Sequence, residues 1–296
     1  MRIVDAHHHI WDPDANPHPW LTGPAIPFRY GDYTAIRRPF LWDDYDRVTE
    51  GRDIVASVTM EGEWDPRDPL GEARWMLALA DRTGRPAAHV SQAWLDAADV
   101  DRVLGDLAQI PIVRGIRHKP RANPAPGGPP GGMTDPAFIA GFRRLSAHGL
   151  IFELQTPWWH LDEAIGLAAH APDVPIVLNH AGLPHVGPSD GLTAWHRALT
   201  RFAQLPQARL KISGLGAMGG GWTPDLNRQI IVRAIDAFGP ERCMFASNYP
   251  VDGLCAPFGE IWSLFETAVA DYADTERAAL FHGTACRTYG LTLEDP

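Results

Sequence analysis

Histidine residues at the ends of two apolar segments are the clearest chemical signal in this sequence. His7 and His9 close the segment RIVDAHHH, and residues two apart on a strand project to the same side. His180 closes the segment VPIVLNH and has the parity of Ile176 and Leu178. Three imidazoles at one edge of a sheet can bind a divalent metal ion. These histidines therefore predict a site for one zinc or manganese ion, and a cluster that works without a metal fits the same residues.

Two carboxylates are candidates for a general base beside these histidines. Glu61 follows the segment IVASVTM and shares the parity of Ser57 and Thr59. Partial burial at the mouth of a site would raise its pKa, which suits a base. Asp252, in the motif SNYPVDG, is the second candidate. A solvated loop acid is the competing interpretation of both residues, and a helix cap is a further one for Asp252.

A basic cluster follows the segment PIVRGI and contains Arg117, His118, Lys119 and Arg121. Arginine binds carboxylates through paired hydrogen bonds, so the cluster predicts an anionic or polyhydroxylated substrate. A solvated positive patch is the alternative. Neighbouring residues on a strand face opposite sides, so Arg117 and His118 cannot both point inward. We favour His118 as a catalytic residue and keep Arg117 as a candidate substrate contact.

Further candidate substrate contacts lie near the ends of other apolar segments. Gln155 continues the parity of Glu153, and Ser213 continues that of Lys211, so we expect all four inside the fold. A buried acid and a buried base need partners, which predicts that Glu153 and Lys211 join one polar network. The aromatic residues that could stack on a sugar or lactone ring are Trp11, Trp20, Trp158, Trp159, Trp222 and Tyr249, of which we favour Trp158 and Tyr249. Ordinary packing is the competing interpretation of each.

Eight short apolar runs alternate with amphipathic patterns along the chain. The predicted strands are 2–6, 53–60, 87–92, 112–116, 150–154, 174–179, 208–212 and 243–246, and the main predicted helices are 70–82, 100–109, 135–148, 161–170, 192–205 and 225–238. Strands that alternate with helices form parallel sheets. The pattern predicts an α/β fold closed into a (β/α)₈ TIM barrel, with an open doubly wound sheet as the alternative.

Residues 1–296 are expected to form a single barrel domain. Two regions interrupt its rhythm: a segment at 11–52, which is rich in Pro, Trp, Tyr and Asp, and a Pro/Gly-rich loop at 119–133. The first is expected to cover the barrel mouth. The second is either a binding loop or a surface insertion.

The composition narrows the class of partner. With 26 basic and 36 acidic residues, the net charge of −10 argues against nucleic acid and anionic membranes. Three cysteines without a CxxC motif, and the absence of a long apolar run, predict a cytoplasmic protein with free thiols. The expected partner is a small molecule. The sequence leaves the oligomeric state open, including a homo-oligomer.

Several motifs, in order, resemble the amidohydrolase superfamily, in the branch that holds L-fuconolactonase, L-rhamnonolactonase and 2-pyrone-4,6-dicarboxylate lactonase. The motifs are VDAHHHIWDP with HPWL, VRGIRH, GLIFELQ, VLNHAGLP, KISGLG, FGPERCMFASNYPVD and RTYGL. The resemblance implies a barrel fold and the hydrolysis of lactones. It also implies an aspartate after the last strand, which serves relatives as a base and often as a metal ligand.

The chain departs from this pattern at Asn248, which stands where the family's SDWP motif has aspartate. An amide cannot accept a proton from water at neutral pH, so Asn248 can orient water or substrate but cannot be the base. Another carboxylate must then be the general base, and we favour Glu61 over Asp252. We expect Asn248 to face the site beside the histidines, because it shares the parity of Met244 and Ala246.

Together these observations predict a hydrolase that opens a small cyclic ester, a sugar-type or dicarboxylate lactone, by attack of water. Two alternatives remain at this point. The scaffold could instead isomerise a lactone or decarboxylate an acid. The loss of the aspartate could also mark a barrel that binds a ligand without turnover.

Overall fold

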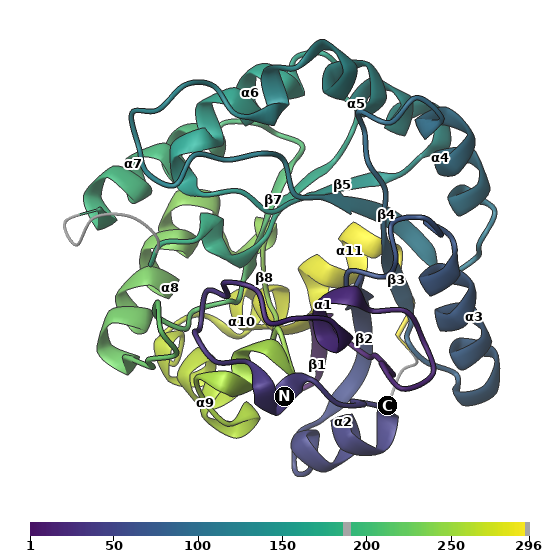
Figure 1. The fold of residues 1–296 in the computed structure, drawn as a ribbon. Coiled ribbons are helices and arrows are strands. Elements are labelled where there is room, and N and C mark those ends of the chain that lie inside the picture. The colour runs from purple at the N-terminus through teal and green to yellow at the C-terminus, as the bar shows by residue number, and fades with distance from the viewer. Residues whose placement is uncertain (186–190, 294–296) are drawn as a thin grey trace.

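The computed structural model describes residues 1–185 and 191–293, and it shows eight parallel strands in sequence order around a barrel (Figure 1). The strands are β1 (Ile3–His8), β2 (Ile54–Met60), β3 (Ala88–Gln92), β4 (Val113–His118), β5 (Ile151–Leu154), β6 (Ile176–Leu178), β7 (Ala208–Ile212) and β8 (Cys243–Phe245). Each pairs with the next in parallel register. The predicted (β/α)₈ barrel is confirmed.

Most of the helices surround the strands on the outside of the barrel, and one of them, α1, lies over the strands (Figure 1). They are α1 (Pro19–Thr22), α2 (Trp42–Thr49), α3 (Gly71–Thr83), α4 (Val100–Ala108), α5 (Pro136–His148), α6 (Leu161–Ala168), α7 (Leu192–Phe202), α8 (Pro224–Phe238), α9 (Phe258–Ala268), α10 (Asp274–Ala278) and α11 (Thr284–Tyr289). No helix in the described ranges is long and apolar enough to cross a membrane.

Two apolar clusters hold the barrel together. One fills the space between strands and helices, and the other fills the barrel interior with side chains such as Val58, Val90, Val177 and Met244. The interior also contains a buried ion pair, in which Lys211 Nζ lies 3.0 Å from Glu153 Oε1 and neither side chain is exposed.

The tyrosine hydroxyl of Tyr289 and the amide of Asn179 both donate to the Glu153 carboxylate. Burial nevertheless lowers the pKa of Lys211 to about 8. The expected polar network of Glu153 and Lys211 is therefore confirmed.

The seam between β1 and β8 is closed just beyond the strands. The backbone N–H of Asn248 donates to His7 O at 2.7 Å, and His9 N–H donates to Tyr249 O at 2.8 Å. Beneath them the buried Asp5 carboxylate accepts from Ser247 N, Ser247 Oγ and the Tyr45 hydroxyl at 2.6–2.9 Å. Burial raises the pKa of Asp5 to about 6 although these bonds lower it. This seam fixes the first histidine motif against the β8 loop.

The segment at 11–52 crosses the molecule over the strands before returning to β2 (Figure 1). Trp11 and Phe40 pair through a short antiparallel bridge, which closes the segment on itself. The loop at 119–133 contains no strand or α-helix, in agreement with its Pro and Gly content.

Candidate functional site

A cavity of about 450 Å³ opens where the strands end, at the end of a barrel where active sites are found. Its floor carries His9, His180, Glu61, Arg117 and Asn248. Its rim is formed mainly by loops, including the segment at 11–52. The volume falls within the range of about 300–1,000 Å³ that is typical of small-molecule sites.

The three predicted histidines lie together, and two of them, His9 and His180, line the cavity. The His7 ring centroid is 5.3 Å from that of His9 and 4.7 Å from that of His180. A register shift in β1 lets His7 turn inward while His8 stacks on Tyr45 outside the barrel, with ring centroids 4.2 Å apart.

The route by which His180 reaches the cavity differs from the expected one. Ile176 and Leu178 pack outward against the helices, whereas Val177 faces the interior, so strand parity would turn His180 away. The strand ends at Leu178, and His180 has a φ of 52°. This turn of the backbone, rather than the parity of β6, directs the imidazole to the cavity. The parity argument for His180 was wrong, although the residue is in the site.

Hydrogen bonds at Nδ1 orient two of the imidazoles. His9 Nδ1 lies 3.1 Å from Met60 O, and a carbonyl can only accept, so Nδ1 carries the hydrogen and Nε2 presents a lone pair. His180 Nδ1 lies 3.0 Å from Ser213 Oγ. Burial lowers the pKa of His7, His9 and His180 well below the usual value, and nearby cations such as Arg117 lower it further. All three rings are therefore neutral at pH 7.

Arg117 occupies the centre of the floor, and Glu61 holds it there. The guanidinium Nε lies 2.5 Å from Glu61 Oε1, and Nη2 donates to Glu61 O at 2.9 Å. Nη1 lies 3.2 Å from Gln155 Oε1 and 3.5 Å from His7 Nε2. Of the two neighbours on β4, the structure therefore places Arg117 in the cavity, whereas His118 packs against Phe138 and lines a second hollow.

The pKa of Glu61 moves in the direction opposite to the one expected. Burial raises it, but Arg117 and Lys119, with hydrogen bonds from Glu63 N and Arg117, outweigh burial and hold the pKa of Glu61 below its usual value. Glu61 also contacts Arg117 through one oxygen and accepts from Glu63 N at 2.8 Å through the other. A carboxylate whose two oxygens both accept hydrogen bonds from fixed donors is poorly placed to take a proton from water.

Asn248 faces the cavity, as expected, and Asp252 lies behind it. The Asn248 amide Nδ2 donates to Asp252 Oδ1 at 2.7 Å, and the Tyr30 hydroxyl donates to the same oxygen at 2.8 Å. Arg29 lies 3.9 Å from that carboxylate. Burial raises the pKa of Asp252, and Arg29 lowers it in part. Asp252 is 1% exposed and does not line the cavity, so it acts on the site through the two cavity residues that it contacts, Asn248 and Arg29.

These residues do not fit a divalent metal ion. Among the described residues, no three His, Cys, Asp or Glu side chains are arranged to hold one. Asn248 supplies an amide where a carboxylate would balance the charge. The Arg117 guanidinium lies against His7 Nε2, and Arg29 and Lys119 add positive charge to the cavity wall. Such a site favours negative charge over a second cation.

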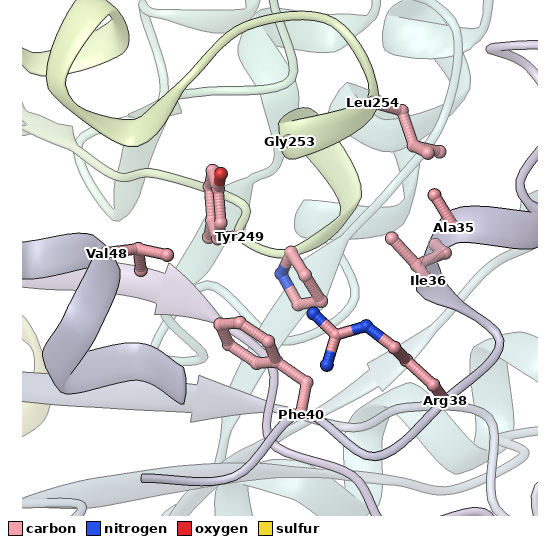
Figure 2. Close-up of a pocket in the computed structure, with 9 residues that line it drawn as sticks. Ala35, Ile36, Arg38, Phe40, Val48, Tyr249, Gly253 and Leu254 are labelled. Atoms are coloured by element: carbon pink, nitrogen blue, oxygen red, sulfur yellow. The ribbon is translucent and has the colours of Figure 1, made fainter. Parts of the chain in front are cut away.

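Two predicted aromatic contacts lie elsewhere. Trp158 is 7% exposed and belongs to the packing between strands and helices. Tyr249 lines a separate cavity of about 210 Å³, and Figure 2 shows it on the side of Phe40 and Val48, opposite Ile36 and Leu254. The structure therefore does not bring these two rings to the histidines.

Some cavity residues gave no signal in the sequence. Arg29 and Phe28 come from the segment at 11–52, where no periodicity indicates which side chains point inward. Lys119 was noted only as part of the basic cluster, yet it lines the cavity and pairs with Glu63.

Comparison with known proteins identifies the family of this chain. A family model described as "Amidohydrolase" matches residues 4–291. The chain belongs to the amidohydrolase family. This amidohydrolase is 37% identical to protein y4mH of Sinorhizobium fredii, over 98% of each chain. It is 30% identical to the L-fucono-1,5-lactonase of Burkholderia ambifaria, over 97% of this chain and 95% of that protein.

A solved relative has the same architecture. An amidohydrolase from Burkholderia multivorans, crystallised with bound zinc, is 28% identical and superposes with a TM-score of 0.81, over 99% of this chain and 100% of that one. The family and these relatives make this amidohydrolase a hydrolase.

Proposed function

We propose that this amidohydrolase opens a lactone ring by attack of water, without a metal ion. The proposal rests on one observation. His9, whose Nε2 presents a lone pair, and Arg117, whose guanidinium is held in place by Glu61, line the floor of the same cavity. The lactonases among its relatives support the substrate class.

His9 is the group that takes the proton from water. Its Nδ1–H is held by Met60 O, so the neutral ring keeps its lone pair on Nε2. Asn248 lines the same floor, and its Nδ2 is committed to Asp252. That bond leaves the amide oxygen to accept a hydrogen bond from the water.

Arg117 stabilises the charge that develops on the substrate. As the water oxygen bonds to the carbonyl carbon, the carbonyl oxygen becomes an oxyanion, which a preorganised donor stabilises far better in a buried site than in water. Glu61 and Gln155 hold the guanidinium in place before the substrate arrives. Collapse of the intermediate breaks the bond to the ring oxygen, which receives the proton from His9 Nε2.

The experiment is a panel of sugar 1,4- and 1,5-lactones and 2-pyrone-4,6-dicarboxylate, followed by proton release and by NMR of the product. We expect ring-opened acid from at least one member, and an isomer or carbon dioxide from none. Replacing the base, His9→Gln, should lower kcat about 10²–10⁴-fold.

A matched control is available in the neighbouring residue. His8 is as deeply buried as His9 but faces Tyr45 outside the barrel, so His8→Gln should keep activity within a few-fold. A panel without any ring-opened product, or a His9→Gln variant as active as the wild type, would overturn the proposal.

A further inference from the structure

A second hollow of about 320 Å³ lies beside the catalytic cavity. The two share the walls formed by Trp20, Glu61, Glu63, Arg117 and Lys119. The second hollow, which we call the side pocket, is otherwise lined by residues that include Gln92, Trp64, Trp94 and His118. Because they share these walls, the two spaces lie side by side.

The side pocket carries one oriented donor and one oriented acceptor. The backbone N–H of Leu95 donates to His118 Nδ1 at 3.1 Å, and burial lowers the pKa of His118, so the neutral ring carries its hydrogen on Nε2. Gln92 Nε2 donates to Trp64 O at 3.1 Å, which fixes the amide and leaves its oxygen free to accept. The described residues give neither His118 Nε2 nor the Gln92 oxygen a hydrogen-bond partner.

Three tryptophans supply the apolar walls of this pocket: Trp20, Trp64 and Trp94. Trp20 is fixed by its own Nε1–H, which donates to Gly62 O at 2.7 Å. Aromatic faces combined with a few fixed polar groups suit a ring that is apolar on its faces and hydroxylated at its edges. A sugar ring has both properties, whereas a plain aromatic ring would leave the donor and the acceptor unused.

We propose that the substrate is a lactone that carries a second sugar ring, with the lactone at the histidines and the second ring in the side pocket. This inference rests on the proposed lactonase function. His118 then contacts the second ring and takes no part in the chemistry. The ion pair of Lys119 and Glu63 lines both spaces, and its side chains are exposed by 34% and 49%. Exposed ion pairs contribute little to stability, so this pair can rearrange around a longer ligand.

The test compares glucono-1,5-lactone with cellobiono-1,5-lactone, which is the same lactone with a glucosyl group on O4. We expect the wild type to prefer the two-ring lactone by about tenfold or more in kcat/KM, the equivalent of one stacking contact and one hydrogen bond. Trp94→Ala and Gln92→Leu should each bring the ratio of the two kcat/KM values close to one, mainly through KM. Trp222→Ala is the matched control, because Trp222 lines neither cavity and should leave the ratio unchanged.

A wild type that hydrolyses the one-ring lactone equally well or better would overturn the side-pocket proposal and leave the lactonase proposal intact. A preference that survives Gln92→Leu would overturn recognition of a sugar. If neither lactone is opened, the lactonase proposal is the one that fails for these rings. Calorimetry with cellobionic acid and gluconic acid then tests the side pocket independently of catalysis. The side-pocket proposal requires that the wild type binds the two-ring acid more tightly than the one-ring acid, and that Trp94→Ala loses this difference; any other result overturns it.

Discussion

Arg117 offers the sharpest test of how the catalytic floor works. Its guanidinium meets Glu61 Oε1, Glu61 O, Gln155 Oε1 and His7 Nε2 at 2.5–3.5 Å. The single ammonium of lysine cannot satisfy these directions together, so Arg117→Lys keeps the charge and loses the geometry. If Arg117 stabilises the oxyanion, kcat should fall about 10²–10³-fold, which is the loss of about 2.7–4 kcal/mol of transition-state stabilisation.

Replacing Arg117 should also lower the stability of the fold, which the activity assay does not measure. Glu61 and Arg117 have side chains exposed by only 4% and 3%, so Arg117→Met strands a buried carboxylate. Breaking a buried ion pair in this way lowers the free energy of unfolding by about 3–5 kcal/mol. The double variant Glu61→Gln/Arg117→Met removes the stranded charge as well and should recover part of that free energy. Urea unfolding followed by tryptophan fluorescence measures both variants.

The sign of the pH dependence follows from the lowered pKa of Glu61. Because the folded-state pKa lies below the unfolded one, the stabilisation is present above the unfolded value of about 4.3 and disappears as the pH falls through the folded value. Arg117→Met should abolish this acid-side loss. An Arg117→Lys variant with unchanged kcat, or an Arg117→Met variant as stable as the wild type at pH 7, would refute the reasoning.

Three further predictions concern the rest of the site and the barrel interior. Lys211→Met should destabilise the fold by about 3–5 kcal/mol, because it leaves Glu153 buried without its cation, and Lys211→Met with Glu153→Leu should be less destabilised than the single variant in urea unfolding. Elemental analysis of protein purified without chelator should find well under one equivalent of zinc or manganese per chain, and activity should survive EDTA. If one equivalent is bound and activity is lost when it is removed, the metal-free mechanism is wrong. Asn248→Asp should place a carboxylate beside Asp252, and we expect zinc affinity measured by calorimetry to rise at least tenfold over the wild type; unchanged affinity would show that the amide is not what excludes the ion.

The sequence predicted the barrel well, because period-2 alternation and helical periodicity are local signals. The interior placement of Glu153 and Lys211 also followed from parity alone. Asn248 faces the cavity as expected, but it lies beyond the end of β8 and has a φ of 51°. Parity failed where the chain leaves a strand. His180 reaches the cavity through a residue with positive φ, and nothing in the local sequence indicates that turn.

The charges of the site could not be predicted from the sequence either. The pKa of Glu61 depends on Arg117, which is 56 residues away along the chain, and on which of Arg117 and His118 turns inward. Arg29 and Tyr30 come from a segment without periodicity, and the hydrogen bond from Tyr30 to Asp252 spans 222 residues. Such contacts are set by the closed barrel and not by any local pattern.

The bonds that join the two ends of the chain have a consequence for how activity first appears. Tyr30 contacts Asp252, Asp5 contacts Ser247, and Arg52 contacts Glu266, so the first fifth of the chain is completed by the last fifth. Contacts between residues so far apart in sequence form late, because closing a long loop costs entropy before any contact repays it. A chain still emerging from the ribosome can therefore build individual strand–helix units while it lacks a binding cavity. Substrate capture begins only once β8 and its loop have joined β1.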